Sequence, residues 1–588
     1  MRRWLYLGLV VATTIPAFER EWTVLRVDGF QPYEIVLLAL FTLLFAWIAS
    51  SFWLACIGAY VRWRKLELAP FAMTPDAGAL RVANSRTAIV MPIYNEDVER
   101  ILAGLEAIRE SVREEGGEGF DIFILSDSTN PDVAAAEIAA VRRMRECGSD
   151  GPTIYYRHRS PNVGRKSGNI QEFCENWGGL YDYMVVLDAD SLMTGKALVR
   201  LVQLMDANPR TALIQVPPQL FGRDSLFARM QQFASSVYGP CFAAGLAFLQ
   251  GADGNYWGHN AIIRVRAFMR HCGLPKLAGS APLGGEIMSH DFVEAALLRR
   301  AGWDVWMAPE LGGSFEEPPP TLVDHLKRDR RWCQGNLQHM RLIFAVGLKL
   351  PSRLHLTLGV MNYLASPLWL VLLVTSAIEM YSFGAVEPVT YVGRYPVLAS
   401  PISHTTELLL LLLFTIVLLY GPKLFALLVM LRDPDETRAH GGAAYAISSV
   451  IFECLFSTLL VPVVMLSHSG FVFSILSGRT AGWGTQQRDD HSLPLSFVVR
   501  LFALHTIVGV AAGAILYRFV PDSLWWFMPL LAGLVLAIPL AYFTSLPWLG
   551  RYARQCGLFQ IPAEAGSVEI ATRLNALSAP AVQRPLAA

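Results

Sequence analysis

The sequence predicts an α/β domain, with a doubly wound and mostly parallel sheet, inserted into a bundle of transmembrane helices. Three observations lead to this fold class. Long apolar runs lie towards both ends of the chain, residues 66–340 between them are richer in charge, glycine and proline, and short apolar runs alternate there with helical patterns. Strands that alternate with helices at this spacing are typical of parallel, doubly wound sheets.

The composition agrees with a membrane protein that carries a polar insert. Hydrophobic residues make up 53% of the 588 residues and charged residues 17%, whereas a water-soluble protein carries about 25% charge. The 49 basic and 49 acidic residues balance, which gives no support to a nucleic-acid partner. The 8 cysteines include no C-x-x-C pair, so neither a zinc site nor a disulfide framework is expected.

Two apolar segments form the predicted N-terminal region, residues 1–65. Residues 1–18 pair two arginines with an apolar run. We interpret them as an uncleaved membrane helix rather than a signal peptide, because the small residues of a cleavage site are poorly placed. Residues 33–61 are long enough to cross a bilayer, and basic residues follow at once. The positive-inside rule therefore places the next region, residues 66–350, in the cytoplasm.

Membrane character returns after residue 350, where four more apolar runs are long enough to cross a bilayer. They fall into two pairs, in the regions 351–440 and 496–550: residues 353–378, 405–431, 497–519 and 523–545. Arginines at 551 and 554 mark a cytoplasmic exit after the last run. The end of the remaining tail, 551–588, is rich in Ala and Pro and is predicted to be mobile.

The region 441–495 decides the topology. Its apolar run, 447–478, is interrupted by a glutamate, a proline and a histidine. A single crossing there would place the later arginines outside, against the positive-inside rule. We therefore interpret this run as an interfacial or re-entrant segment that does not cross, with a broken pair of helices as the alternative. Either arrangement leaves the polar segment 482–490 facing the cytoplasmic domain.

Carboxylates follow two of the predicted strands. Asp188 and Asp190 come directly after the strand at 183–187, at the edge of the sheet where open α/β sheets bind ligands. Acid-rich turns are also common without any function. Two acids at this edge can, however, hold a divalent cation that in turn holds phosphate oxygens. Asp127 ends the strand at 120–125 in the same way.

Three further segments suit phosphate and hydroxyl chemistry. Residues 162–169 form a basic, glycine-containing turn before a helix, where N–H groups and Lys166 suit phosphate oxygens. Asp291 begins an amphipathic helix, as either a helix cap or a general base for a hydroxyl proton. Arg331 and Trp332 lie in a basic run. This run is either a lipid-facing cluster or a diphosphate clasp with a flat face for a sugar ring.

Together these motifs resemble the processive inverting family 2 glycosyltransferases, which include cellulose and hyaluronan synthases. The resemblance covers about residues 85–490 and implies a cytoplasmic domain of the GT-A fold. It implies that Asp127 binds the uracil of a UDP-sugar and that Lys166 contacts the nucleotide. It further implies that Asp188 and Asp190 bind the diphosphate through Mg²⁺ or Mn²⁺.

The resemblance also covers the acceptor side. The S-H-D triplet that ends at Asp291 matches the family's catalytic triplet, which implies that Asp291 is the general base and that His290 lies near the acceptor. Arg331 and Trp332 match an Arg-Trp pair that clasps the donor diphosphate and the acceptor. Arg328 stands where the family has a glutamine, so the role of that glutamine has no direct counterpart here.

Residues 482–490 resemble, more loosely, the gating loop that closes over UDP in these synthases. The matching residues are Trp483, Gln486, Gln487 and Arg488. In detail the motifs are most similar to a Gram-negative branch that makes the β-1,2-linked backbone of osmoregulated periplasmic glucans. That branch implies an inner-membrane enzyme with UDP-glucose, a growing glucan and membrane lipids as partners. It leaves open whether an acyl carrier protein takes part.

Two other functions stay open at this point. A cellulose- or hyaluronan-type synthase would differ only in sugar or linkage. A transporter whose cytoplasmic domain senses nucleotide would have no transfer activity. The predicted spans carry few ionisable residues, which disfavours a transport pathway, because such pathways usually hold ionisable groups at membrane depth.

Overall fold

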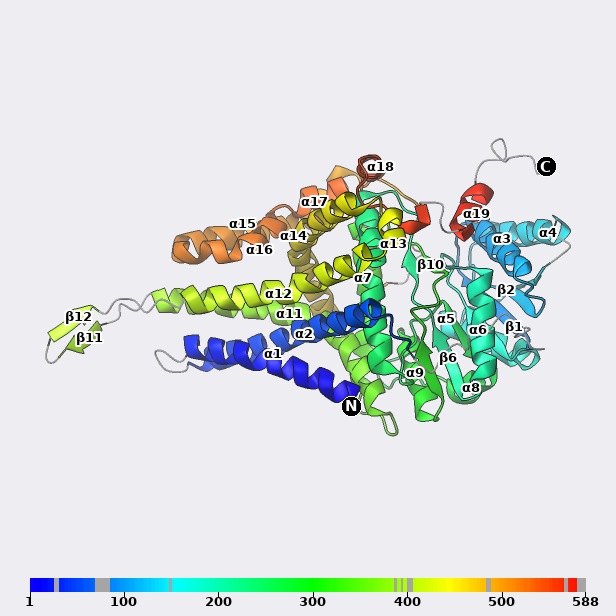
Figure 1. Ribbon diagram of the computed structural model, residues 1–588, viewed down its shortest axis with the longest axis horizontal. Helices are drawn as coiled ribbons and strands as arrows, with labels where there is room; N and C mark the ends of the chain where they lie inside the picture. Colours follow the sequence, from blue (N-terminus) through cyan, green and yellow to red (C-terminus); the bar gives the residue numbers. More distant parts are fainter. Residues whose placement is uncertain are drawn as a thin grey trace.

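The computed structural model describes the chain apart from residues 26–30, 69–84, 148–150, 385–388, 393–394, 399–404, 483–487, 565–568 and 579–588. Two parts lie along its long axis, a bundle of apolar helices and an α/β domain (Figure 1). Helix α7 (Leu226–Gln250) runs across the junction between them. The predicted fold class, an α/β domain inserted in a bundle of membrane helices, is confirmed.

The α/β domain is built on a seven-stranded sheet in the order β3-β2-β1-β4-β8-β6-β9. Strand β8 is antiparallel to both of its neighbours, and the other neighbouring pairs are parallel. The sheet is therefore mixed, with the predicted parallel order from β3 to β4. The strands span Thr87–Ile93 (β1), Phe120–Ser126 (β2), Thr153–His158 (β3), Tyr183–Val186 (β4), Thr211–Gln215 (β6), Ala261–Arg264 (β8) and Asp304–Met307 (β9).

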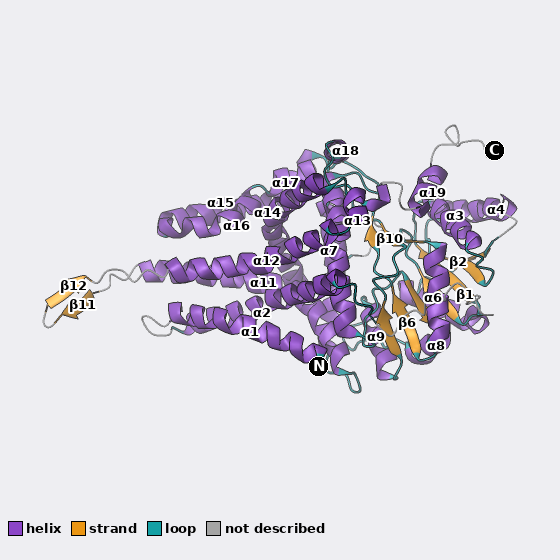
Figure 2. Ribbon diagram, in the orientation of Figure 1, coloured by secondary structure: helices purple, strands orange, loops and turns teal. Residues whose placement is uncertain are grey.

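Helices cover both faces of the sheet (Figure 2). Successive side chains of a strand point to opposite faces. In β1, Ile89 and Met91 accordingly pack in one core, and Ala88 and Val90 in the other. Burial on both faces explains why the central strands are apolar throughout. The first face carries α3 (Val98–Glu114), α4 (Pro131–Cys147) and α6 (Gly195–Ala207), and the second carries α5 (Arg165–Trp177), α8 (Val265–His271) and α9 (His290–Arg300).

Five helices of the described chain are long and apolar enough to cross a membrane. They are α2 (Pro32–Trp63), α11 (Leu350–Gly384), α12 (Thr405–Leu431), α14 (Ala443–Leu476) and α15 (Leu495–Phe519). A bent pair, α16 (Met528–Val535) and α17 (Ala537–Thr544), counts as a sixth when it is taken as one span. Residues 2–25 form one continuous helix, α1 (Arg2–Leu25), that packs on α2 and is less apolar than it.

Helix α14 is one unbroken helix of 34 residues, so the broken pair of helices that was the alternative for residues 447–478 is wrong. The polar residues expected to interrupt it are paired instead. Glu453 accepts hydrogen bonds from Lys423 (2.8 Å) and from Tyr238 of α7 (2.9 Å). His468 hydrogen-bonds Asp329 (3.0 Å) of α10 (Leu322–Gln338). The helix therefore touches elements at the junction with the α/β domain towards both of its ends. These contacts support the interfacial course, which we retain as a proposal.

The C-terminal segment, predicted to be mobile, is partly built into the fold. Helix α18 (Pro547–Gln555) is followed by a turn and by α19 (Glu569–Ser578), which packs on α3 with Ile570 buried. Arg229 of α7, with a side chain only 1% exposed, pairs with Glu564 through two hydrogen bonds of 2.6 and 2.8 Å. This buried charge pair holds this part of the C-terminal segment against α7. Composition alone could not reveal the pair, because its two residues lie far apart in the sequence.

Loss of the Glu564 carboxylate is expected to destabilise the protein. Glu564→Gln removes the nearest counter-charge of the buried Arg229 guanidinium and leaves only the more distant Asp224 (3.9 Å) beside it, which costs about 3 kcal/mol. The expected result is a lower melting temperature in detergent and faster amide exchange in α19. Glu99→Gln is the matched control, because Glu99 pairs with Arg143 on an exposed surface and should cost about 0.5 kcal/mol or less. Equal effects of the two substitutions would contradict a structural role for the buried pair.

Candidate active site

A cavity of about 1440 Å³ brings the predicted site residues together. Its walls come from the ends of β2 and β4, the starts of α5 and α9, the middle of α10 and the segment after α14. The predicted residues that line it are Asp127, Lys166, Asp188, Asp190, His290, Asp291, Arg331, Trp332 and Arg488. The other predicted loop residues, Trp483, Gln486 and Gln487, lie outside the described residues.

Asp127 lies at the carboxyl end of β2, where its N–H donates to the Ile93 carbonyl at 2.9 Å. Its side chain is 4% exposed and accepts two hydrogen bonds from Arg159, at 2.5 Å from Nε and 2.9 Å from Nη2. Arg159 directly follows β3, the neighbouring strand. A bidentate arginine holds a carboxylate in one orientation. Asp127 therefore presents a fixed, charged acceptor at this edge of the sheet.

Lys166, in the first turn of α5, forms an ion pair with Asp188 and donates to the Gly258 carbonyl at 2.8 Å. Burial raises the pKa of Asp188, but the charges of Lys166 and His259 outweigh it and hold that pKa below its usual range. Burial lowers the pKa of His259, but Asp188 and Glu316 outweigh it and raise that pKa to about 9. Asp188 and His259 are therefore both ionised, and their opposite charges lie beside each other.

Arg488 joins the other acid of the motif to the end of β1. Its guanidinium pairs with Asp190, and its Nε lies 3.1 Å from a carboxylate oxygen of Glu96. Burial lowers the pKa of Arg488, but Asp190 and Glu96 outweigh it and raise the pKa. Burial raises the pKa of Glu96, with Arg488 acting against it. The segment likened to a gating loop thus places a cation directly on Asp190.

The donor set at Asp188 and Asp190 fits the predicted divalent cation. The described residues contain no group of three or more His, Cys, Asp or Glu side chains that could hold a metal ion by themselves. Mg²⁺ is commonly held by one or two carboxylates together with substrate phosphates and water. Asp188 supplies an ionised oxygen donor, and Asp190 is paired with Arg488, a cation whose place a metal ion can take. The two acids suit Mg²⁺ or Mn²⁺ with a diphosphate completing the coordination.

Asp291 lies in the first turn of α9, whereas Ser289 takes the N-cap position. The alternative that Asp291 is the helix cap is therefore wrong. Its carboxylate packs against Gly258, where an added Cβ would lie 3.3 Å from Oδ2. Burial raises the pKa of Asp291, the charge of His290 lowers it and that of Glu294 raises it. His290 is in turn held by Glu294, at 3.0 Å from Nδ1. A carboxylate with a raised pKa at the wall of a cavity suits a general base.

Helix α10 carries the Arg-Trp pair to the wall of the same cavity. Trp332 is 48% exposed, and the guanidinium of Arg328 stacks over its ring at 4.3 Å. Burial lowers the pKa of Arg331, and the charges of Arg328 and Arg488 lower it further. Cations gathered at one wall suit a diphosphate, which arginine binds with two parallel hydrogen bonds. Arg328, in place of the glutamine, provides a stacking partner for Trp332.

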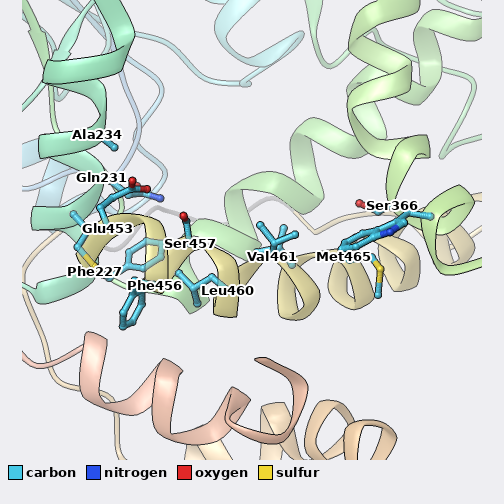
Figure 3. Close-up of a pocket in the computed structure, with 13 residues that line it drawn as sticks. Phe227, Gln231, Ala234, Ser366, Glu453, Phe456, Ser457, Leu460, Val461 and Met465 are labelled. Carbon is cyan, nitrogen blue, oxygen red and sulfur yellow. The ribbon is translucent and has the colours of Figure 1, made fainter. Parts of the chain in front are cut away.

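A second and smaller cavity, of about 310 Å³, lies between α7, α11 and α14 (Figure 3). Most of its lining is apolar, and its polar groups include Gln231, Glu453 and Ser457. Lys423 donates to both Glu453 (2.8 Å) and Ser457 (2.9 Å), so these groups belong to one paired network. None of the predicted site residues lines this cavity. The acids and cations needed for chemistry lie in the larger cavity instead.

Comparison with known proteins assigns the chain to a family. Residues 88–272 match the Glycosyl transferase family 2 profile, and residues 183–431 match Glycosyl transferase family group 2. A glucans biosynthesis glucosyltransferase H from Xanthomonas oryzae pv. oryzae is 42% identical over 594 residues, covering 100% of this chain and 90% of the relative. A Shewanella baltica protein of the same name is 42% identical, covering 97% and 78%. The chain belongs to the glucans biosynthesis glucosyltransferase H family.

Two further proteins are similar to this glycosyltransferase. A relative of the same name from Cupriavidus pinatubonensis is 44% identical over 96% of this chain, which spans 65% of that protein. Among solved structures, a mannosyltransferase from Pyrobaculum calidifontis in complex with GDP-Man and Mn²⁺ matches with a TM-score of 0.44 and 17% identity. That match covers 68% of this chain and 97% of the other.

Sequence reasoning missed several charged residues of this glycosyltransferase site. Glu96 follows β1, Arg159 follows β3, and Glu316 ends β10 (Ser314–Glu316) in a small second sheet. A signal was present for the first two, because each is a charged residue just after a strand of the same sheet as Asp127. Glu316 had no such signal, since β10 pairs with two-residue strands that no periodicity reveals.

Proposed function

We propose that the protein transfers glucose from UDP-glucose to a growing glucan, with inversion at the anomeric carbon. Its product in this proposal is the β-1,2-linked backbone of osmoregulated periplasmic glucans. The observation that carries the proposal is the convergence of Asp127, Asp188, Asp190, Asp291 and Arg331 on one cavity, which residues of the apolar helix α11 also line. The names of the relatives support the glucan and the glucosyl group.

The donor side of the cavity binds UDP-glucose. The uracil lies near Asp127, whose orientation is held by Arg159. Asp188 and Asp190 would hold Mg²⁺ or Mn²⁺, which supplies positive charge for the diphosphate. Lys166 and the arginines of α10 add cations around the same oxygens. Stabilising the charge that grows on the leaving UDP is expected to be the largest catalytic contribution.

The acceptor side supplies the nucleophile. Asp291 takes the proton from the acceptor hydroxyl as that oxygen attacks the anomeric carbon from the face opposite UDP. The new glycosidic bond forms while the bond from the anomeric carbon to the diphosphate oxygen breaks, and UDP leaves with the electron pair. Trp332 offers its half-exposed ring to the acceptor sugar, and His290 lies next to the base.

The proposed location is the inner membrane, with the catalytic domain in the cytoplasm. Several basic residues at helix ends lie on the side of the α/β domain. Arg62 at the end of α2 pairs with Glu436 (2.6 Å), and Arg551 of α18 pairs with Asp224 (3.7 Å), just before α7. Basic residues on the catalytic side support a cytoplasmic position for it.

Product analysis tests the proposal directly. The purified protein is incubated with radiolabelled UDP-glucose and Mg²⁺ or Mn²⁺, and the polymer is digested with linkage-specific glucanases. We expect release of UDP and a polymer that a β-1,2-glucanase degrades and a cellulase does not. A cellulase-sensitive polymer, or use of another UDP-sugar, would indicate a cellulose- or hyaluronan-type synthase. The absence of UDP release with every UDP-sugar would favour the nucleotide-sensing transporter.

A further inference from the structure

The C-terminal half of α10 packs against the segment that leads into Asp291. Three side chains on this part of the helix and just after it, Gln334, Gln338 and His339, are between 0% and 4% exposed. None of them lines the active-site cavity. All three make hydrogen bonds to backbone atoms of residues 282–289, which immediately precede α9. They therefore contact the support of the catalytic triplet and not the substrate.

Gln338 binds three backbone groups of this segment with a single amide. Its Nε2 donates to the carbonyls of Pro282 (3.2 Å) and Glu286 (3.1 Å), and its Oε1 accepts from the N–H of Met288 (2.9 Å). A buried amide that satisfies three backbone groups fixes a loop that has no regular structure of its own. Leaving such buried groups unpaired is costly, so the loop is held in this one position.

His339 holds the residue at which α9 is capped. Its Nε2 lies 2.9 Å from the carbonyl oxygen of Ser289, two residues before Asp291. Burial lowers the pKa of His339 to about 4, so the ring is neutral at physiological pH. Because the facing group is a carbonyl, Nε2 carries the proton and donates it. The ring also packs edge-on against Phe292, the residue after Asp291, with centroids 5.7 Å apart.

Two further residues on the same part of α10, Gly335 and Gln334, also contact neighbouring segments of the chain. A Cβ at Gly335 would lie 2.2 Å from Ser289 Oγ, so only glycine permits this close approach to the triplet. Gln334 donates from Nε2 to the Pro282 carbonyl (3.1 Å) and accepts at Oε1 from the N–H of Ala481 (2.7 Å). Ala481 belongs to the chain segment that continues to Arg488.

We propose that Gln338 and His339 are positioning residues, which set the location of Asp291 relative to the acceptor, and that Gln334 ties this support to Ala481, after the end of α14. The inference rests on the proposed role of Asp291 as the base. Proton transfer requires the base within hydrogen-bond reach of the hydroxyl. A displacement of about 1 Å can cost about 100-fold in rate. Helix α10 thereby sets the Arg-Trp pair and the base in one rigid unit.

Two polar replacements of His339 form the first test. His339→Gln can place an amide donor near the position of Nε2, whereas His339→Asn reaches only the position of Nδ1 and leaves Ser289 without its donor. We expect kcat within about threefold of the wild type for the first, and a loss of about 10- to 100-fold for the second. The dissociation constant for UDP-glucose, measured by calorimetry, should change by less than about threefold in both, because neither side chain touches the donor.

Gln338→Leu is the second test, with Gln232→Leu as its matched control. Gln232 of α7 is equally buried, at 1% exposed, and holds the backbone of Arg223 through both amide atoms (2.8 and 3.1 Å). Both substitutions should lower the melting temperature. Only Gln338→Leu should lower kcat, by about 10- to 100-fold, with donor binding retained. If Gln338→Leu does not fold, the two His339 variants decide the question.

Two outcomes would overturn the inference. One is wild-type kcat in both His339→Asn and Gln338→Leu, or in His339→Asn alone where Gln338→Leu does not fold. The other is equal loss of kcat in His339→Gln and His339→Asn. Asp291→Asn, measured in parallel, separates this failure from failure of the proposed function. An inactive Asp291→Asn beside active positioning variants removes only the positioning role, whereas an active Asp291→Asn removes the base itself.

Discussion

Replacement of Asp291 by asparagine is expected to lower kcat by about 100- to 10,000-fold, the range for loss of a general base. Asparagine keeps the size and polarity of the side chain but cannot take up the acceptor proton. Binding of UDP-glucose should persist, because the predicted donor contacts come from the ends of β2 and β4, the start of α5 and from α10. Initial rates of UDP release and calorimetric titration with UDP-glucose measure the two effects separately.

Asp304→Asn is the control for this substitution. Asp304 begins β9 and pairs with Arg299, near the other end of α9, at 2.8 Å, and it does not line the cavity. Its loss should affect stability and leave kcat within about threefold, as for other sites away from the reacting groups. Wild-type kcat in a correctly folded Asp291→Asn protein would show that another group takes the proton.

The pH dependence of kcat gives a second check on Asp291. Burial raises its pKa above the ordinary aspartate value of about 3.9. A general base works only when ionised, so activity is complete above this raised pKa and is lost as the pH falls through it. The acidic limb of the profile should therefore lie at higher pH than an exposed carboxylate would give. The residual activity of Asp291→Asn should lack this limb.

Replacement of Asp190 by asparagine is expected to abolish tight Mn²⁺ binding and to lower kcat/KM by about 1,000-fold, since the charge that develops on the diphosphate loses its counter-charge. The substitution also removes the Asp190 carboxylate from Arg488, whose guanidinium still pairs with Glu96. Titration of Mn²⁺ by electron paramagnetic resonance, with and without UDP, measures the binding without reference to turnover.

Asp121→Asn is the matched control for the metal site. Asp121 is a buried acid on β2, at the end of the strand opposite Asp127, and it binds Arg86 and Tyr181 at 2.7 Å each. Its replacement should lower stability and leave Mn²⁺ affinity unchanged. An unchanged Mn²⁺ affinity in Asp190→Asn would mean that the cation is held elsewhere.

The strands of the parallel half of the sheet could be predicted closely from the sequence. β2 and β4 were expected at 120–125 and 183–187, and they span Phe120–Ser126 and Tyr183–Val186. A strand covered on both faces is apolar at nearly every position, which leaves a clear signal. Parallel strands also bring their carboxyl ends to one edge. The meeting of Asp127 with Asp188 in one cavity was predictable for that reason.

Charge pairs across long sequence separations could not be predicted. Glu453 and His468 were expected only to interrupt an apolar run, and the structure pairs them with Lys423 and Asp329 inside one continuous helix. The C-terminal segment was expected to be mobile, and Glu564 instead reaches the buried Arg229. A buried charge is tolerated when it is paired with an opposite charge. The residues around it in the sequence do not indicate which distant residue that partner is.

The amino-acid sequence by itself determined the strands of the parallel half of the sheet, most of the long apolar helices and the acids at the edge of the sheet. These features follow from local burial, because the periodicity of apolar residues in a segment indicates which of its positions are buried. Only the tertiary structure decided that Arg488 meets Asp190, that Arg159 meets Asp127 and that Gln338 and His339 support the base. Such contacts depend on how segments far apart in the sequence pack together. The periodicity of one segment does not show which other segment it will meet.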